Sequence, residues 1–581
     1  MDDGRIKQGV GERTVAEAYL SALKNQGVDY VFANPGTDFA PIIEALVQAN
    51  DTGSDIPQFV TVPHENVAMS MAQGYYKVSG KMAGVMVHVT VGTANALCGL
   101  MNASRDNVPL LLAAGRTPLT EAGDAGSRNV GIHWGQEAFD QGGMTREYVK
   151  WDYELRTGQP VEDVIRRALD IAMTGPRGPV YLTLPREVLG GVAVEPGPGA
   201  TRTAGAARAA GALPGAPSAA AIEQVADALA GAENPLMISG GTFHSAAAFA
   251  ALAELADRYA FPVTEMSGGS MATSHRMNLG GPPREIVKDA DVIVILDGAV
   301  PWIPRFGEPS ADATIIQIAS DPNFQDLPFR GHRTDIAVVG EPSLAIPLLR
   351  DALAGKLKNK QAVVDARRKR IEAKRAAMDD ARAKLLSEAR DMSPIHPAWT
   401  AHCLNEIKDD DAIIVNELGL QMDLVEMNQP GCYLAGGGAG GLGRGLGEAL
   451  GAKLAAPDRQ VIAAVGDGSY MFCVPTAAHY VGRAEGLPTL TLVSNNAEWF
   501  AVRRATTSMY PTGRASKANT LPLVELSPSP AFEKTIEACG GYGEAVEDPA
   551  KLPAALERAF QAIADGNSAL LNIKTRAGGR G

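Results

Sequence analysis

A short stretch near the carboxyl end combines residues that could bind a metal ion and a diphosphate. Gly466-Asp467-Gly468 follows a strongly apolar segment, and Asn495-Asn496 follows the next such segment. A carboxylate, an amide oxygen and nearby backbone carbonyls are the oxygen ligands that Mg²⁺ prefers, with phosphate oxygens completing its octahedron. The two glycines would let a diphosphate approach the backbone, and Ser469 could donate hydrogen bonds to it. These residues predict a site for magnesium and a diphosphate.

A second candidate for chemistry lies far upstream. Pro63-His64-Glu65 ends an apolar segment and precedes a helical one. A glutamate in the first helical turn interacts favourably with the helix dipole, and taken alone this structural reason is sufficient for Glu65. Together with the magnesium motif, a catalytic role becomes the better interpretation.

The elements that must position these residues are short β-branched runs alternating with amphipathic helical stretches, a pattern typical of α/β domains. The predicted strands include 29–36, 58–65, 84–89 and 109–115 in a first block, 234–241, 261–266, 290–298 and 313–322 in a second, and 411–419, 460–468 and 487–496 in a third. Ligands bind at the carboxyl ends of strands in open α/β sheets, so we expect Asp467 and Asn496 to meet there. The pattern predicts three doubly wound parallel-sheet domains.

Two changes in composition divide the chain. The predicted domains are residues 11–190, 219–352 and 394–581, joined by a linker over 191–218 and a basic linker helix over 353–393. The linker is rich in Gly, Ala and Pro, which disfavours regular structure. The helix has an apolar residue at every seventh position: Val364, Ile371, Met378 and Leu385. Its positive charge could serve a nucleic acid or a partner helix, but a solvated helix packed along an acidic body is the simpler interpretation.

Composition excludes several classes of protein. The 581 residues carry a net charge of −13, which argues against a nucleic-acid-binding surface. The five cysteines lie far apart without a C-x-x-C pair, so neither a disulfide framework nor a zinc ribbon is indicated. The amino terminus has no apolar leader segment, and no stretch approaches the roughly 18 apolar residues of a membrane span. We therefore expect a cytoplasmic protein without a nucleic-acid or membrane partner.

The motifs together resemble those of the thiamine diphosphate (ThDP) enzyme family, whose signature is GDG followed, somewhat under thirty residues later, by NN. The resemblance covers nearly the whole chain and implies a pyrimidine-binding, a central and a diphosphate-binding domain. It implies ThDP and Mg²⁺ as cofactors, with Asp467, the side chain of Asn496 and the backbone carbonyl of Glu498 as metal ligands. Further cofactor contacts would come from Gly466, Gly468, Ser469 and, as a weaker candidate, Gln421.

At the pyrimidine end, the stretch Gly440-Gly441-Leu442-Gly443 matches the family's GG-[hydrophobic]-G motif. Leu442 corresponds to the bulky residue that holds the cofactor in a V shape, and the carbonyl of Gly440 would accept a hydrogen bond from the 4′-amino group. Glu65 corresponds to the catalytic glutamate that hydrogen-bonds N1′ and so promotes loss of the C2 proton. The first domain would have to meet the third domain of another subunit, so the resemblance implies a homo-oligomer, at least a dimer and by expectation a tetramer.

Within the family, some segments resemble the benzoylformate decarboxylases. Thr37 in NPGT matches a serine that meets the substrate carboxylate, and His88 becomes a catalytic candidate for proton transfer, with a buried strand histidine as the equal alternative. Other features point away, because no histidine falls within 298–305 and two phenylalanines of the phenyl pocket correspond to Gly436 and Ala505. The remaining substrate candidates are Gln136, which is similar to a glutamine of the synthases, and Trp499, Val502 and Arg503.

The resemblance therefore implies carbon–carbon bond cleavage or formation next to a carbonyl, with decarboxylation of a 2-oxo acid through a C2 ylid and an enamine as the leading function. The alternatives are an acetolactate-synthase-like carboligase or transferase, with FAD in the central domain as a less favoured addition, and a lyase acting on diketones or acyl-CoA substrates. A catalytically silent regulatory subunit is disfavoured by the intact Glu65, Asp467 and Asn496. A nicotinamide dehydrogenase is disfavoured because no G-x-G-x-x-G opens a helix after the first strand of a block.

Overall fold

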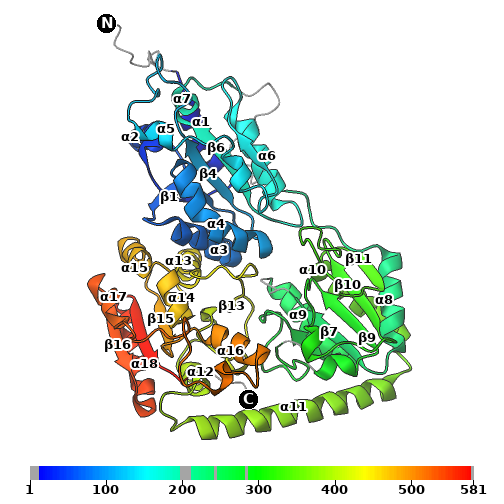
Figure 1. Ribbon diagram of the computed structural model, residues 1–581. Coiled ribbons are helices and arrows are strands. Elements are labelled where there is room, and N and C mark those ends of the chain that lie inside the picture. The colour runs from blue at the N-terminus through cyan, green and yellow to red at the C-terminus, as the bar shows by residue number, and fades with distance from the viewer. Residues whose placement is uncertain (1–11, 196–210, 241–244, 282–284, 577–581) are drawn as a thin grey trace. The chain divides into compact units, whose positions relative to one another are not determined.

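The computed structural model describes residues 12–195, 211–240, 245–281 and 285–576. The chain divides into two compact units. The first unit comprises residues Met1–Leu213, Gly437–Pro457 and Tyr470–Leu487, and the second comprises Pro214–Gly436, Asp458–Ser469 and Pro488–Gly581. The described residues form one parallel sheet in the first unit and two in the second (Figure 1), which confirms the predicted fold class of three parallel-sheet α/β domains. The centre of the predicted linker, residues 196–210, lies outside the described residues.

The first sheet has the strand order β2-β1-β3-β4-β6-β5 with parallel neighbours throughout. Its strands are β1 (Tyr30–Asn34), β2 (Gln58–Thr61), β3 (Gly84–Val87), β4 (Leu111–Arg116), β5 (Asp152–Glu154) and β6 (Val180–Pro185). The order reverses between β1 and β3, and a reversal of this kind places a ligand crevice at the carboxyl ends of the two strands. His88 follows β3 directly, and Asp38 lies in the short 3-10 helix Thr37–Phe39 that follows β1.

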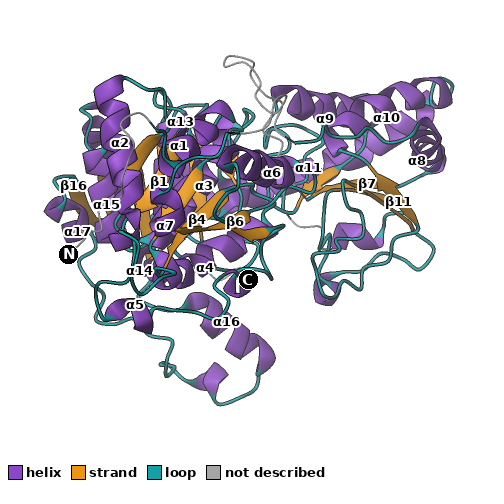
Figure 2. Ribbon diagram, turned by 90° about the horizontal axis from the view of Figure 1, so that it is seen from above, coloured by secondary structure: helices purple, strands orange, loops and turns teal. Residues whose placement is uncertain are grey.

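Helices enclose the first sheet (Figure 2). The helices are α1 (Val15–Asn25), α2 (Ala40–Thr52), α3 (Glu65–Ser79), α4 (Val89–Arg105), α5 (Ile132–Gly135), α6 (Val161–Met173) and α7 (Arg186–Gly190). Helices α1, α2, α6 and α7 share one core with alternating strand residues such as Val31 and Ala33. Helix α1 begins at a capping box, in which Thr14 and Glu17 satisfy each other's free backbone amides.

Two helices from the third block of sequence, α13 (Gly445–Ala455) and α15 (Pro475–Ala484), belong to the first unit. Helix α13 packs backbone to backbone on α3. A Cβ on Gly74 would lie 2.0 Å from the carbonyl oxygen of Glu448, and a Cβ on Gly451 would lie 2.0 Å from that of Met71. Only glycine permits this approach, so the sequence fixes how closely the two helices pack.

The second unit contains two further parallel sheets, ordered β11-β10-β9-β7-β8 and β13-β12-β14-β15-β17-β16. Their strands are β7 (Pro235–Ser239), β8 (Val263–Glu265), β9 (Val292–Leu296), β10 (Thr314–Ala319), β11 (Ile336–Val339), β12 (Ile413–Glu417), β13 (Tyr433–Leu434), β14 (Val461–Gly466), β15 (Leu490–Asn495), β16 (Tyr542–Val546) and β17 (Ala569–Lys574). The third sheet reverses its order between β12 and β14. This reversal places residues 416–421 and Asp467 at a second ligand-binding edge.

The helices of the second unit surround these two sheets. They are α8 (Ala219–Gly231), α9 (Ala246–Tyr259), α10 (Pro342–Lys356), α11 (Gln361–Ala389), α12 (Pro397–Asn405), α16 (Phe500–Met509), α17 (Glu533–Ala538) and α18 (Leu552–Ala564). Helix α14 (Asp467–Phe472) directly follows β14. None of the described helices is both long and apolar enough to cross a membrane.

The long helix α11 forms within the predicted basic segment, and its apolar stripe is partly buried. Val364 and Ile371 are buried in the core of the second sheet, and Leu385 packs partly against the core of the third. Met378, between these two contacts, is 42% exposed. Arg367 is buried instead, and its guanidinium donates to carbonyls at the end of α8.

Candidate active site

The third sheet brings Asp467 and Asn496 to the ends of the neighbouring strands β14 and β15. Oδ1 of Asp467 accepts a hydrogen bond from the Gly468 amide at 2.8 Å. Burial raises the pKa of the Asp467 carboxyl, although the backbone amides of Gly468 and of residues 496–498 oppose this shift. Oδ2 is buried without a hydrogen-bond partner among the described residues. An unpaired buried carboxylate oxygen is costly unless a cation binds it, so the site fits a divalent metal ion.

The two asparagines after β15 differ in their surroundings. The amide nitrogen of Asn495 donates to Ser529 at 2.8 Å and to Asn572 at 2.9 Å. The side-chain amide of Asn495 is therefore used for hydrogen bonds within the domain. Oδ1 of Asn496 accepts from the Glu498 amide at 3.0 Å and keeps a second lone pair for another partner. This difference supports Asn496, rather than Asn495, as the predicted metal ligand.

No three His, Cys, Asp or Glu side chains gather into a metal site within the described part of the chain. The predicted ligands, by contrast, combine one carboxylate with an amide and a backbone carbonyl, which is a set suited to Mg²⁺ together with phosphate oxygens.

The glycines of the GDG motif have different environments. Gly466 ends β14, and a Cβ on it would meet nothing closer than 3.6 Å. A Cβ on Gly468 would lie 2.1 Å from Cζ3 of Trp499, so this glycine makes room for an indole ring. The need to accommodate Trp499 is therefore an alternative explanation for Gly468, besides the expected close approach of a diphosphate. Ser469 is buried beside it in α14.

Residues 418–421 follow β12 as a loop, in which Leu418 forms a bridge with Val465 of β14. Oδ1 of Asn416 accepts from the amides of Gly419 at 3.1 Å and Leu420 at 2.9 Å, so its side chain shapes the loop. Gln421 ends the loop and is half-buried. Within this loop, the family resemblance implied a cofactor contact only for Gln421, and the role of Asn416 in organising the loop was not predicted.

The segment after the metal motif leads into α16. Arg503 donates through Nε to the Glu498 carboxylate at 2.6 Å, so its charge is already paired. An anionic substrate would have to compete with Glu498 for this group. Trp499 precedes the helix and donates its backbone amide to Val524 at 2.7 Å. Val502 is 47% exposed on α16.

In the first unit, Glu65 is the first residue of α3 and is 6% exposed. His64 caps this helix, because its Nδ1 accepts from the Asn66 amide at 3.2 Å. Asn95 on α4 donates to Oε2 of Glu65 at 3.1 Å. A Cβ on Gly92 would lie 3.3 Å from Oε1, so the carboxylate lies directly against the first turn of α4. Glu65 is a buried carboxylate with acceptor capacity left for a ligand.

His88 occupies the N-cap position of α4 at the edge of the first sheet, without a capping hydrogen bond from its side chain. Its Nδ1 lies 2.5 Å from Oδ1 of Asp38, and its Nε2 lies 3.1 Å from the side-chain nitrogen of Gln136. The hydrogen bond to Asp38 raises the pKa of His88 against the opposing effect of burial, and the charges of Asp38 and Glu65 add to this. Thr37 is exposed beside Asp38. The structure thus brings two substrate candidates, His88 and Gln136, into contact.

Asp38 was not among the predicted residues. The signal that could have found it is its position two residues after Gly36, on the strand edge that also carries His88. A carboxylate and a histidine at the ends of neighbouring strands have a high chance of contact.

The glycine-rich loop before α13 is held by the far end of α4. The side chain of Asn102 accepts from the Gly441 amide at 3.1 Å and donates to its carbonyl at 2.8 Å. The Asp106 carboxylate accepts from the amides of Gly437 at 2.9 Å and Gly438 at 3.0 Å. Neither Asn102 nor Asp106 was predicted. The loop that contains Gly440 and Leu442 is therefore fixed on the first unit.

A buried ion network supports this loop. Lys77 on α3 lies 3.2 Å from Asp106 and 3.0 Å from Glu448, which also accepts from Arg444 at 2.5 Å. Burial would raise the pKa of Asp106, but Lys77, the amides of the glycine loop and Arg444 outweigh it and hold this pKa below its ordinary value. The network couples α3, α4 and α13.

Comparison with known proteins decides the family. Three models match the chain: "Thiamine pyrophosphate enzyme, N-terminal TPP binding domain" at residues 13–144, "central domain" at 222–349, and "C-terminal TPP binding domain" at 419–573. The chain belongs to the thiamine diphosphate-dependent enzyme family. The predicted resemblance is thereby confirmed, and thiamine diphosphate is the cofactor that these domains bind.

Individual ThDP enzymes resemble the chain over most of its length. Benzoylformate decarboxylase of Pseudomonas aeruginosa is 27% identical over 516 residues, covering 84% of this chain and 87% of the relative. An acetolactate synthase large subunit of Mycobacterium tuberculosis is 25% identical over 565 residues, covering 95% and 94%. The structure of 4-hydroxybenzoylformate decarboxylase from Rhodococcus jostii RHA1 shares the fold, with a TM-score of 0.75 at 23% identity over 97% of this chain and 99% of that one.

Proposed function

We propose that this ThDP enzyme also requires Mg²⁺ and decarboxylates a 2-oxo acid. The observation that carries the proposal is the pairing of His88 with the buried carboxylate of Asp38, on the same sheet edge as Thr37 and near Glu65. In this arrangement His88 could transfer a proton, and the nearby hydroxyl of Thr37 could bind a substrate carboxylate. The similarity to benzoylformate decarboxylase over 84% of the chain supports the same reaction class.

The residues that would hold the cofactor fall into two groups. Asp467, Asn496 and the carbonyl of Glu498 would bind the metal ion, and residues 466–469 with Gln421 would border the diphosphate. Glu65, Gly440, Gly441 and Leu442 would contact the pyrimidine end. When bound, thiamine diphosphate supplies an electron sink next to the carbonyl carbon.

The protein side of the reaction consists of positioning and proton transfer. Glu65 would hold a proton shared with the cofactor, within a site from which its burial excludes water. His88 would exchange a proton with the reacting carbon or oxygen through Nε2. The hydroxyl of Thr37 would bind the substrate carboxylate, and Trp499 and Val502 would border the substrate tail.

The proposal includes a homo-oligomer, at least a dimer and by expectation a tetramer, and a cytoplasmic location. Glu65 is held near Asn95, whereas the glycine loop is held by Asn102. These positions are about 10 Å apart along α4 at 1.5 Å per residue. Within one chain, Glu65 and the glycine loop thus lie about two helical turns apart along α4. This separation supports a site that is completed by a second subunit. Gel filtration with light scattering tests this.

A second candidate is an acetolactate-synthase-like carboligase, with FAD in the central domain as its less favoured variant. Two observations favour it: the 25% identity to a synthase subunit over 95% of the chain, and the contact between Gln136 and His88 in a loop similar to that of the synthases. Product analysis with pyruvate as the sole substrate separates an acyloin from an aldehyde, and visible flavin absorbance would indicate FAD.

The deciding experiment measures CO₂ release from aliphatic, branched and aromatic 2-oxo acids, with and without added ThDP and Mg²⁺. Release that depends on both cofactors and is lost in Glu65→Gln supports the proposal. Calorimetric ThDP binding without release from any acid contradicts it and favours a lyase acting on diketones or acyl-CoA substrates.

A further inference from the structure

His88 lies between a buried carboxylate and a side-chain amide. Its Nδ1 contacts Oδ1 of Asp38 at 2.5 Å, and Asp38 is only 3% exposed. Its Nε2 lies 3.1 Å from Nε2 of Gln136. A carboxylate only accepts hydrogen bonds, so Nδ1 carries a proton, whereas an amide nitrogen only donates, so Nε2 accepts. The surroundings therefore select one neutral tautomer of the imidazole.

The sheet edge is shaped to hold this pair. A Cβ on Gly36 would lie 2.0 Å from Nδ1 of His88, and a Cβ on Gly115 would lie 1.7 Å from Oδ2 of Asp38. Val89, directly after His88, has a φ of 31°, in the left-handed region that β-branched residues rarely adopt. A strained backbone of this kind persists only where its surroundings enforce it, and such strain gathers at functional sites.

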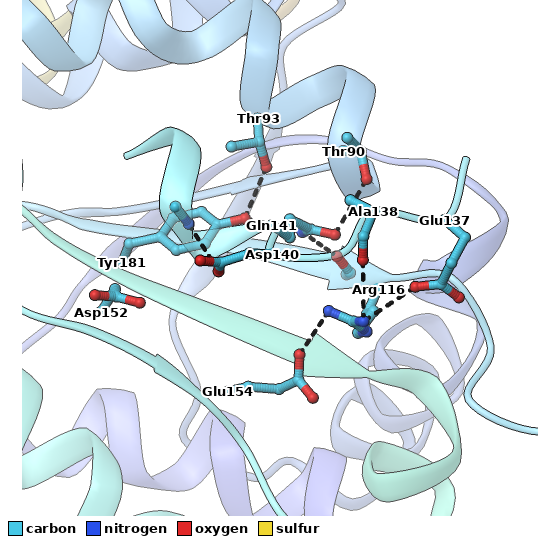
Figure 3. Close-up of polar contacts among 12 residues, drawn as sticks. Thr90, Thr93, Arg116, Glu137, Ala138, Asp140, Gln141, Asp152, Glu154 and Tyr181 are labelled. Carbon is cyan, nitrogen blue, oxygen red and sulfur yellow. Dashed lines mark hydrogen bonds and ion pairs between the residues drawn. The ribbon is translucent and has the colours of Figure 1, made fainter. Parts of the chain in front are cut away.

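The loop that carries Gln136 is held by a set of polar contacts, most of them partly buried (Figure 3). Thr90 donates to the carbonyl of Gln136 at 3.0 Å. It also donates to Oε1 of Gln141 at 3.2 Å. Gln141 is 2% exposed and donates to the hydroxyl of Tyr181 at 2.9 Å. Further contacts join Arg116 to Glu137, Ala138 and Glu154. The backbone at Gln136 is therefore fixed, and its terminal amide is the part that can turn.

We propose that Asp38 and Gln136 are positioning residues for His88. Asp38 keeps a proton on Nδ1, so that Nε2 is the atom that gains and loses a proton, and the Gln136 amide turns to present its oxygen when Nε2 becomes protonated. The role in turnover rests on the proposed function, because it requires that His88 exchanges protons during the reaction. The pairing itself is a property of the resting enzyme.

Among the described residues, the titratable groups that interact electrostatically with His88 are Asp38 from the 3-10 helix Thr37–Phe39, Glu65 from α3 and His133 from α5. The hydrogen bond to Asp38 is the largest influence that raises the pKa of His88. Removing the charge of Asp38 while keeping its shape must therefore lower this pKa, with Glu65 and His133 unchanged.

The test measures the titration of His88 in the full-length enzyme loaded with ThDP and Mg²⁺, by hydrogen–deuterium exchange at the imidazole Cε1 read by mass spectrometry. In Asp38→Asn we expect the midpoint to move to lower pH. Asp29→Asn is the matched control, because Asp29 precedes the opposite end of β1 and pairs with Lys24 at 3.0 Å and Lys81 at 2.8 Å. Its substitution should leave the midpoint of His88 in place.

Turnover adds a second readout. With a substrate that releases CO₂, Asp38→Asn should lower kcat by about 10²-fold, within the 10²–10⁴-fold that general acid–base catalysis contributes, and move the pH limb of kcat in the same direction. An unmoved midpoint overturns the proposal, and so does a moved midpoint with an unchanged pH profile. A moved midpoint in an enzyme that decarboxylates no acid overturns the proposed function but not the pairing.

A second variant covers the case in which Asp38→Asn does not fold. Gln136 lies on a half-buried loop position, and Gln136→Glu would place a carboxylate at Nε2. We expect this change to move the His88 midpoint to higher pH, whereas Gln136→Leu should not. Identical midpoints in the two variants would show that Nε2 does not face residue 136 and would overturn the proposal.

Discussion

The indole of Trp499 lies against the backbone of Gly468, where a Cβ would come within 2.1 Å of Cζ3. Gly468→Ala should therefore force the ring to move. Overpacking of this kind costs about 1–3 kcal/mol, and the shifted segment includes the predicted metal ligand Glu498. We expect a lower unfolding temperature and weaker Mg²⁺-dependent ThDP binding, measured by thermal shift and calorimetry.

Gly355→Ala is the matched control for this substitution. Gly355 lies in α10, and nothing lies within 4 Å of a Cβ placed there. Alanine in a helix interior is more stable than glycine by about 0.5–1 kcal/mol. Equal unfolding temperatures of the two variants would contradict the steric role of Trp499.

Removal of the cofactors should destabilise the enzyme through Asp467. A ligand that binds only the folded state adds about 2.7 kcal/mol of stability at a concentration of 100 times its Kd. We expect ThDP with Mg²⁺ to raise the unfolding temperature of the wild type, EDTA to reverse the rise, and Asp467→Asn to show neither effect. A magnesium-dependent rise that persists in Asp467→Asn would exclude this carboxylate as a ligand.

Asn102 should control the glycine loop. Asn102→Ala loses the two hydrogen bonds to Gly441, and at about 0.5–1.5 kcal/mol each the free energy of unfolding should fall by about 1–3 kcal/mol. ThDP should bind more weakly as the loop loosens. Asn102→Asp keeps the acceptor for the Gly441 amide, so its affinity should lie between those of the wild type and Asn102→Ala. A ThDP affinity unchanged in both variants would separate this loop from the cofactor site.

Loss of Lys77 should be far more damaging than loss of a surface lysine. Lys77→Met leaves Asp106 without its cation and weakens the pairing of the fully buried Glu448, and breaking a buried pair costs about 3–5 kcal/mol. Lys288→Met, which breaks the exposed pair with Glu285, should cost less than about 1 kcal/mol. Denaturant unfolding of both variants gives the comparison.

The same variant has a defined pH dependence. The folded-state pKa of Asp106 is lowered, so its stabilising effect is present above the unfolded value of about 3.9 and is lost as the pH falls through the folded value. The stability difference between the wild type and Lys77→Met should therefore be largest above about pH 4 and narrow in more acid solution. A difference that grows on acidification would contradict this.

Features carried by short stretches of sequence were predictable. Asp467 and Asn496 follow consecutive strands of one βαβ unit, so the strand pattern alone placed them at neighbouring strand ends. The cap at His64 and the start of α3 at Glu65 also depend only on nearby residues. Strand and helix positions could be predicted for the same reason, because apolar periodicity is local.

Contacts between distant segments could not be predicted in this way. Asp106 meets Gly437 and Gly438 more than three hundred residues along the chain. No local pattern distinguishes it from an ordinary helix-terminal aspartate. The seven-residue stripe of α11 did not reveal that Met378 is 42% exposed, because periodicity describes one helix and not the surface that covers it. Asp38 was overlooked because its role depends on a neighbouring strand.

The glycine-to-backbone contact between α3 and α13 limits how this chain could be recombined. A chimaera that took the first block from a relative would keep Gly451 on α13. The relative's α3 would then have to bring its backbone as close to Gly451 as Met71 does here. Crossover points in the linker over 191–218 or in the basic helix over 353–393 would take α3 and α13 from different parents. Working hybrids should therefore inherit α3 and α13 from the same parent, even though some 370 residues separate the two helices in the chain.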